Sequence, residues 1–286
     1  MQKIKALAIL NAISFILHLG IVYMTQNKML NTKDVGEVSD QFTSFFTPAD
    51  FTFAIWGIIY TCLGIFCLYH IVMAYKHQKV NPANVDLVAI GPWFIFTNLA
   101  SAAWLWAWTN EQLLLSVALI FVQLLSLIII HARLGIHMPL RSAGSKTCTE
   151  FPLSIYFGWI SIATVANTAT YLVSIGWDGA GIPAVTWTMI ALAVIISLTV
   201  LMVMLRKNIA FGLVAMWGLY GIVYRLTGFD TNEYQDLINI AWGGIALIML
   251  LCLLQVGRSI IARSKRRGVL DIRRGKTFPE SAQPVK

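Results

Sequence analysis

Charged residues are scarce in this chain. Only 12% of its 286 residues are Asp, Glu, Lys or Arg, whereas 58% are hydrophobic, and its mean hydropathy is +0.72. A soluble domain usually carries about 25% charged residues, so this chain has too little polar surface to cover a globule in water. The shortage excludes an ordinary water-soluble protein and predicts an integral membrane protein.

Ionisable side chains are also missing from the middle of every long apolar run. Asp50, Asp86 and Arg225 lie at the ends of such runs, where a side chain can reach the membrane interface, and only His18 lies deep. Ion-coupled transporters and intramembrane hydrolases commonly need carboxylates or paired histidines at this depth. Their absence weighs against ion coupling and against an enzyme, and leaves no candidate catalytic residue. His18 could ligate an iron porphyrin or relay a proton, but we favour a neutral imidazole hydrogen-bonded to a neighbouring helix.

Cysteine is rare as well. Three of the four cysteines lie in apolar runs, and Cys148 lies in a basic segment between two runs. Their spacing resembles no metal site, and no pair lies on the side expected to face an oxidising compartment. We therefore expect no metal site and no required cofactor.

Long apolar runs are abundant. Each has roughly 17–25 residues, enough to cross a hydrocarbon core of about 30 Å as a helix, and backbone buried in lipid must be helical to satisfy its own hydrogen bonds. The sequence therefore predicts an all-α polytopic membrane helix bundle with about eight transmembrane helices. The expected spans are residues 4–24, 52–75, 87–108, 113–132, 152–175, 183–205, 209–225 and 237–257.

Basic residues gather on one side of this arrangement. With eight spans, most of the 21 Lys and Arg residues fall on the side of both termini, and most of the 13 acidic residues fall on the other. The positive-inside rule then predicts a cytoplasmic (cell) membrane protein with both termini in the cytoplasm. The net charge of +8 fits contact with anionic membrane lipid and needs no nucleic acid. One bent helix across residues 206–208 is the alternative to the sixth and seventh spans, and it would break this pattern.

Ten tryptophans are present, and an aromatic belt at the membrane interface explains only some of them. The belt accounts for Trp106, Trp108 and Trp177 at the outer ends of spans. Trp56, Trp159 and Trp217 instead fall at least one turn inside theirs, where several indoles around one cavity would make a host for a flat hydrophobic ligand.

Two helix faces support such convergence. Trp56, Tyr60 and Gly64 share one face of the second span by their spacing, and a second set shares one face of the fifth. Small residues beside an indole leave room for a ligand or for another helix, and spacing alone favours helix packing. The second set is Trp159, Ala163, Ala166 and Asn167.

At these residues the chain resembles the tryptophan-rich sensory protein family (TspO/MBR, the translocator or peripheral-type benzodiazepine receptor family). That family's second helix reads roughly PPxWVFGPVWTxLYxxMG, and "TPADFTFAIWGIIYTCLG" matches it at Pro48, Trp56, Tyr60 and Gly64. Its fifth helix reads PYLAWVSFATVLN. The segment "IYFGWISIATVAN", residues 155–167, matches that helix at Tyr156, Trp159, Ser161, Ala163, Thr164, Val165 and Asn167.

The resemblance covers residues 1–177 and departs from the family pattern in places. Asp50 replaces a tryptophan, Phe53 and Ala54 replace a Gly-Pro pair, and Ser101 replaces an asparagine, with Asn98 one turn earlier. We accordingly divide the chain into a TspO-like five-helix bundle, three additional transmembrane helices and a basic tail. The predicted boundaries are residues 1–177, 178–257 and 258–286, and the tail is expected to be a disordered extension at the lipid surface.

The resemblance implies a protein that binds a tetrapyrrole, either porphyrin or haem, for sensing or transport, in a cavity beneath the loop between the first two helices. Two alternatives remain open: a permease for an uncharged lipid or small solute built on the last three helices, and a pigment-degrading membrane enzyme. A homodimer through the small residues Ser154 and Gly158 is also open. The predicted ligand-binding residues are Trp56, Tyr60, Asn98, Trp104, Trp159, Ala163, Ala166 and Asn167.

Overall fold

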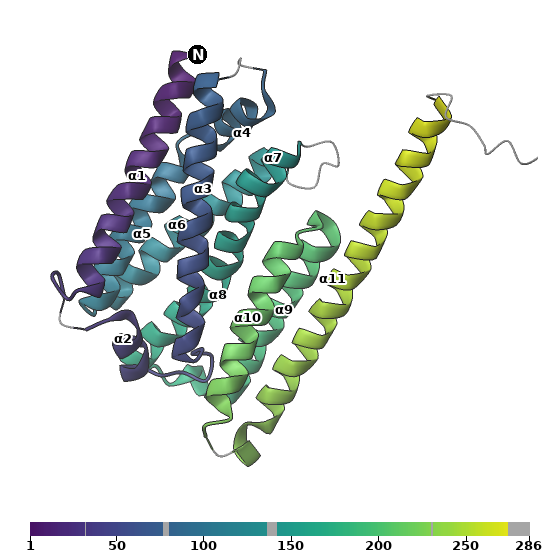
Figure 1. The fold of residues 1–286 in the computed structure, drawn as a ribbon. Helices are drawn as coiled ribbons and strands as arrows, with labels where there is room; N and C mark the ends of the chain where they lie inside the picture. The colour runs from purple at the N-terminus through teal and green to yellow at the C-terminus, as the bar shows by residue number, and fades with distance from the viewer. Residues whose placement is uncertain (32, 77–79, 136–141, 230, 274–286) are drawn as a thin grey trace, which may run out of the picture.

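A computed structural model describes residues 1–31, 33–76, 80–135, 142–229 and 231–273; side chains at 231–233 and 263–273 are outside the description. The described chain is helical and contains no strand (Figure 1). Its long helices follow the expected spans and confirm an all-α polytopic bundle. They are α1 (Gln2–Gln26), α3 (Ile55–Lys76), α4 (Pro82–Ile90), α5 (Trp93–Thr109), α6 (Leu113–Leu134), α8 (Phe151–Ser174), α9 (Ala184–Arg206), α10 (Ile209–Leu226) and α11 (Thr231–Arg273).

Within the described residues, six helices are long and apolar enough to cross a membrane, or seven if a bent pair counts as one span. The helix α8, predicted as the fifth span, is not among them, although its 24 residues would extend about 36 Å. Its run from Pro152 to Ile162 is buried on all sides by neighbouring helices. Because much of α8 meets protein rather than lipid, it tolerates hydroxyl and amide side chains that lower its hydropathy.

The expected third span is not one helix. It is divided into α4 and α5, which meet at an angle of 54°. Gly91 ends α4 with a φ of +58°, and Pro92, which has no backbone N–H, begins the next helix. The prediction of an unbroken helix over residues 87–108 was therefore wrong, and the sequence Gly-Pro is the physical reason.

The helices form two groups that meet at α8. The first group comprises α1, α3, α4, α5, α6 and α8, and the second comprises α9, α10 and α11. The helix α10 packs directly on α8, where a Cβ built at Gly158 would lie 3.1 Å from Val214 Cβ. Ser154 on the same face accepts a hydrogen bond from Asn208 at 3.0 Å. Ser154 and Gly158 are therefore covered by α10 of the same chain and are not free to form a dimer interface. The homodimer stays a prediction, but its interface would have to lie elsewhere.

The turn between α9 and α10 confirms two antiparallel helices over the sixth and seventh spans. Lys207 adopts a left-handed conformation with φ of 52°, and the Asn208 side chain caps α10 by accepting from Phe211 N–H. At the other end of this group, α11 continues to Arg273. The expectation of disorder from residue 258 was therefore wrong as far as Arg273, and residues 274–286 lie outside the described part.

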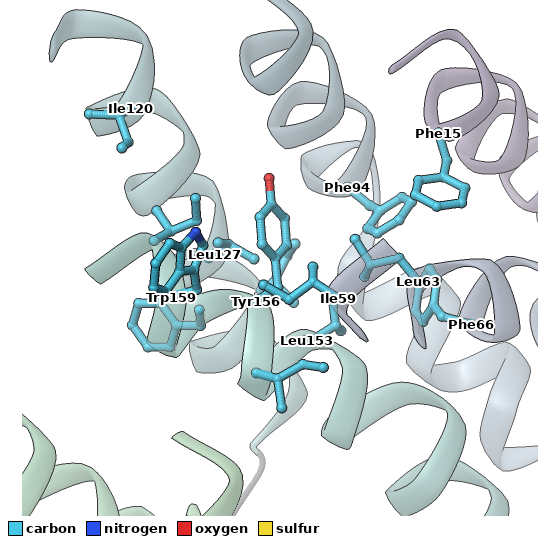
Figure 2. Packing of buried hydrophobic residues seen from close by; sticks show 14 of the residues in the cluster. Phe15, Ile59, Leu63, Phe66, Phe94, Ile120, Leu127, Leu153, Tyr156 and Trp159 are labelled. Atoms are coloured by element: carbon cyan, nitrogen blue, oxygen red, sulfur yellow. The ribbon is translucent and has the colours of Figure 1, made fainter. Parts of the chain in front are cut away.

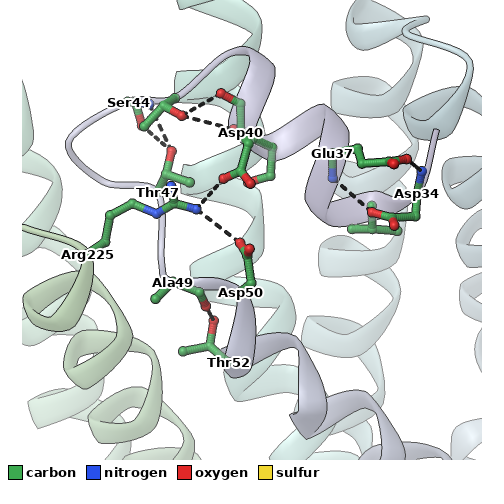
Figure 3. A network of polar contacts seen from close by, with 12 residues as sticks. Asp34, Glu37, Asp40, Ser44, Thr47, Ala49, Asp50, Thr52 and Arg225 are labelled. Atoms are coloured by element: carbon green, nitrogen blue, oxygen red, sulfur yellow. Dashed lines mark hydrogen bonds and ion pairs between the residues drawn. The ribbon is translucent and has the colours of Figure 1, made fainter. Parts of the chain in front are cut away.

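The loop between α1 and α3 covers the end of the bundle opposite the N-terminus (Figure 1). It contains the short helix α2 (Val35–Gln41), which begins with a capping box of Asp34 and Glu37 (Figure 3). The loop also joins the two groups. Arg225 of α10 donates to Asp40 at 2.6 Å and to Asp50 at 3.1 Å, and Ala49 N–H donates to Gly221 O at 3.0 Å.

Candidate functional site: an aromatic cluster beside a separate cavity

Aromatic side chains from three helices converge on Trp56 of α3. Tyr60, one turn further along α3, stacks on it with ring centroids 5.2 Å apart and planes 23° apart. Trp104 of α5 lies 6.4 Å away, and Trp159 of α8 meets Trp56 edge-on at 6.2 Å. Tyr156 of α8 completes the ring contacts at 6.1 Å. These distances lie within the range of favourable aromatic pairs, and they bring four of the predicted residues into one cluster.

The rings differ in how completely protein covers them. Trp159 is 1% exposed and Trp104 is 7% exposed, and Figure 2 shows Trp159 and Tyr156 packed among aliphatic side chains. Trp56 and Tyr60 are half-buried, although both make ring contacts inside the bundle. Part of the cluster therefore retains accessible aromatic surface.

The asparagine of the fifth predicted span connects three helices. Asn167 of α8 accepts a hydrogen bond from Trp104 Nε1 at 2.7 Å and donates to Ser116 Oγ of α6 at 2.9 Å. The side chain is 2% exposed, so these bonds offset the cost of burying its amide. Asn167 therefore binds side chains of two neighbouring helices, α5 and α6. Its bond with Trp104 Nε1 also fixes the orientation of that indole.

A second asparagine lies on the opposite border of the cluster. Asn98 of α5 donates to Phe94 O at 2.7 Å, and its amide oxygen accepts from His18 Nδ1 of α1 at 3.3 Å. This is the interhelical histidine bond that the sequence favoured. The His18 ring also meets Tyr60 edge-on at 5.4 Å, which connects Asn98 to the cluster through the imidazole.

The two predicted alanines take different positions. Ala163 packs against the core that contains Trp56, Trp104 and Trp159. Ala166 packs against the core formed with α9, α10 and α11. The structure therefore brings seven of the eight predicted residues to the cluster or its border, and Ala166 to the opposite side of α8.

Two buried aromatic-ring nitrogen atoms of this region have no hydrogen-bond partner within the described residues: Trp159 Nε1 and His18 Nε2. His18 Nδ1 carries the proton it donates to Asn98, so Nε2 of a neutral ring presents a lone pair. A buried polar atom without a partner is costly. Both atoms are consequently candidates for contact with a ligand.

Sequence reasoning missed several contributors. On α6, Ser116 accepts a hydrogen bond from Asn167, and Gln123 accepts one from the Tyr156 hydroxyl at 3.2 Å. A glutamine in the middle of an apolar span is a signal that could have identified the second of these. Trp108 was expected in the interfacial belt, but it is 4% exposed and donates to Val35 O of α2 at 3.1 Å. That expectation was wrong because α2 covers this end of α5.

The loop between α1 and α3, which covers the cluster, is stabilised by ion pairs. Glu37 accepts from the Asp34 N–H and from Lys28 Nζ at 3.0 Å, and these bonds hold its pKa below the ordinary value. A bond from Lys33 likewise lowers the pKa of Glu111, which lies in the turn between α5 and α6. Both carboxylates are therefore ionised at neutral pH and attach the loop to the ends of α1 and α5.

A large cavity lies on the other side of α8. It has a volume of about 1120 Å³ and is lined by residues of α6, α8 and α9, with the loop residues 43–46 at one end. None of the eight predicted residues lines it. The aromatic cluster and this cavity are separate features, divided by α8.

This fold and this interior cluster define a multi-pass helical membrane protein whose bundle core is rich in tryptophan. The chain belongs to the family described as TSPO-like protein, whose model matches residues 8–254. The predicted resemblance is confirmed, and the match extends through α9 and α10 into α11. Membership makes the chain a membrane protein of the sensory or translocator type. No curated protein and no solved structure matches it.

Proposed function

We propose that this protein binds a flat hydrophobic ligand, a tetrapyrrole such as protoporphyrin or haem, at the aromatic cluster, and that it senses or transports this ligand. The observation that carries the proposal is the convergence of Trp56, Trp104 and Trp159 from three helices beneath α2. Stacked and edge-on indoles give a macrocycle large apolar faces at low conformational cost. The accessible surface of Trp56 and Tyr60 identifies the side on which a ligand would enter.

The surrounding polar atoms support the same assignment. Trp159 Nε1 would donate to an acceptor of the ligand, and the lone pair of His18 Nε2 would accept from a pyrrole N–H or contact an iron. Asn167 would act as a positioning residue, because it holds the Trp104 indole through its Nε1. The ligand-binding residues proposed are therefore those predicted from the sequence, with Ala166 placed apart from the cluster.

A titration of the full chain in nanodiscs with protoporphyrin tests the proposal, read by the porphyrin's own absorbance. Trp56→Ala should weaken binding by about fivefold or more, since an aromatic pair is worth about 0.5–1.5 kcal/mol beyond its buried area. Trp106→Ala is the matched control. It removes an indole from α5 that is 44% exposed and lies outside the cluster. Absence of saturable binding, or equal losses in both variants, would refute the proposal.

Comparison of haem with iron-free protoporphyrin tests whether His18 Nε2 contacts an iron or accepts a hydrogen bond from a pyrrole N–H. If Nε2 contacts the iron, His18→Ala should shift the haem Soret band and weaken haem more than protoporphyrin. Equal effects on both ligands would limit His18 to its contacts with Asn98 and Tyr60.

A permease for an uncharged lipid or small solute is the second candidate function. The supporting observation is the cavity along α8, because α9 of the three C-terminal helices forms one of its walls. Flux of such a solute into liposomes that is unaffected by protoporphyrin would favour this function. Flux equal to that of protein-free liposomes would exclude it.

A further inference from the structure

The cavity beside α8 is a groove on the lateral surface of the bundle. The helix α9 packs mainly on α10 and α11 and touches α8 only sparsely, which leaves a space between α6 and α9 with α8 behind it. Phe121 and Ile128 on α6 and Val194 on α9 line the groove and are exposed. The groove therefore opens where the bilayer hydrocarbon would lie.

Most of the groove offers no polar contact to a ligand. Its hydroxyl groups on α8 bond their own helix: Ser161 donates to Phe157 O, Thr164 to Ile160 O and Thr168 to Thr164 O. Hydroxyls satisfied in this way present mainly methyl and methylene groups. The walls suit an acyl chain, which needs no hydrogen bond.

The two ends of the groove differ in charge. At the end where α6 and α9 terminate, the lining residues include Arg206 and His131. At the opposite end they include Asp178 and the aromatic pair of Trp177 and Trp187, whose ring centroids are 5.3 Å apart. An anionic group is attracted to the first end and repelled from the second.

His131 supplies an independent indication of a ligand. The residue is 8% exposed, and its Nδ1 donates to Leu127 O at 2.9 Å. Its Nε2 is buried without a partner among the described residues, although the side chain lines the groove. Because Nδ1 carries the proton, Nε2 of the neutral ring accepts a hydrogen bond, such as one from a hydroxyl.

We propose that the groove between α6, α8 and α9 binds one anionic bilayer lipid, with its acyl chains along α8 and its head group between Arg206 and His131. Arg206 binds the phosphate, since a guanidinium has five donors and can serve an anion in addition to its contacts within the chain. His131 Nε2 accepts from a head-group hydroxyl, such as those of a glycerol. The site is distinct from the aromatic cluster, because α8 separates them, and the two proposals can fail independently.

The charges also favour this occupant over an uncharged cargo. An uncharged solute would gain no charge–charge attraction from Arg206 and would leave the difference in charge between the two ends of the groove without a role. A volume of about 1120 Å³ exceeds the 300–1,000 Å³ typical of sites for compact small molecules and suits a ligand with long chains.

Native mass spectrometry of the full chain tests the lipid site, after delipidation and titration with phosphatidylglycerol or phosphatidylcholine of the same acyl chains. The wild type should retain one phosphatidylglycerol at least about tenfold more tightly than phosphatidylcholine, since hydrogen bonds to charged groups are the strong ones. Arg206→Gln should abolish most of this preference, and Arg206→Lys should keep part of it. Lys207→Gln is the matched control, because it removes the adjacent positive charge from a residue that does not line the groove.

Two further variants keep the test decisive. His131→Phe should weaken phosphatidylglycerol more than phosphatidic acid, which has no glycerol hydroxyl beyond its phosphate. Ala191→Trp on the α9 wall should block both lipids by filling the groove while leaving protoporphyrin binding unchanged. Equal retention of the two head groups by the wild type, or equal losses in Arg206→Gln and Lys207→Gln, would overturn the proposal.

Discussion

Replacing Asn167 by alanine should remove the hydrogen bonds through which this amide connects three helices, and should destabilise the bundle. The substitution removes the bond from Trp104 Nε1 and the bond to Ser116 Oγ. Ser116 keeps a bond to Leu113 O at 2.7 Å, but no other partner of Trp104 Nε1 is seen among the described residues. The main cost is therefore one buried indole N–H without an acceptor.

The expected magnitude follows from these two contacts. Interhelical hydrogen bonds in membranes average about 0.6 kcal/mol each, so two give about 1.2 kcal/mol. An unsatisfied buried donor sets an upper value near 3 kcal/mol. We expect Asn167→Ala to lower the free energy of unfolding by about 1–3 kcal/mol.

Reversible unfolding in bicelles measures this loss, and a double-mutant cycle with Trp104→Phe isolates the pair. A coupling energy of at least about 0.5 kcal/mol is expected, as for residues in direct contact. Thr168→Ala is the control, because the neighbouring hydroxyl bonds only its own helix. A loss no greater than that of the control, with no coupling to Trp104, would refute the reasoning.

Three more predictions concern the loop between α1 and α3 and its contacts with the second helix group. Gly221→Ala should lower the free energy of unfolding by about 1–3 kcal/mol through overpacking, because its Cβ would lie 2.0 Å from Thr52 Cγ2. Gly57→Ala is the control and should be neutral in the same unfolding assay, because no atom lies within 4 Å of the added Cβ. Arg225→Gln should raise the rate of limited proteolysis in the loop by about fivefold, as its ion pairs with Asp40 and Asp50 are worth about 1 kcal/mol; an unchanged rate would contradict this. The lowered pKa of Glu37 stabilises the start of α2 fully above about pH 4.3, and this contribution is lost as the pH falls through the lowered pKa. The hydrogen-exchange protection factors at α2, which are corrected for the intrinsic pH dependence of amide exchange, should therefore fall on acidification, and Glu37→Gln should remove most of that fall.

Much of the aromatic cluster could be predicted from the sequence. The spacing of Trp56 and Tyr60 places them on one helix face, and both make ring contacts at the cluster. Trp159 could be placed inside the bundle because it falls in the middle of its span. Such arguments succeed because they use contacts within one helix, whose geometry is fixed.

The particular partners in contacts between helices could not be named from the sequence. The partners of Asn167 lie 63 and 51 residues away, on α5 and α6, and no periodicity within α8 indicates them. Ala166 shares a predicted face with Trp159 but packs on the opposite group, because α8 has helices of both groups around it. The groove was equally hidden, since it depends on how far α9 lies from α8.

Some missed features did have a sequence signal. The Gly-Pro pair at residues 91 and 92 is a known helix breaker, and it divides α4 from α5. The basic segment after residue 258 contains good helix formers such as alanine, arginine and lysine, which explains why α11 continues to Arg273.

A structure determined with protoporphyrin bound tests the central claim most directly. We expect the macrocycle in contact with the rings of Trp56 and Trp104 beneath α2, with the groove between α6 and α9 free of it. A porphyrin in that groove, or on the lipid-facing surface away from the three indoles, would contradict it.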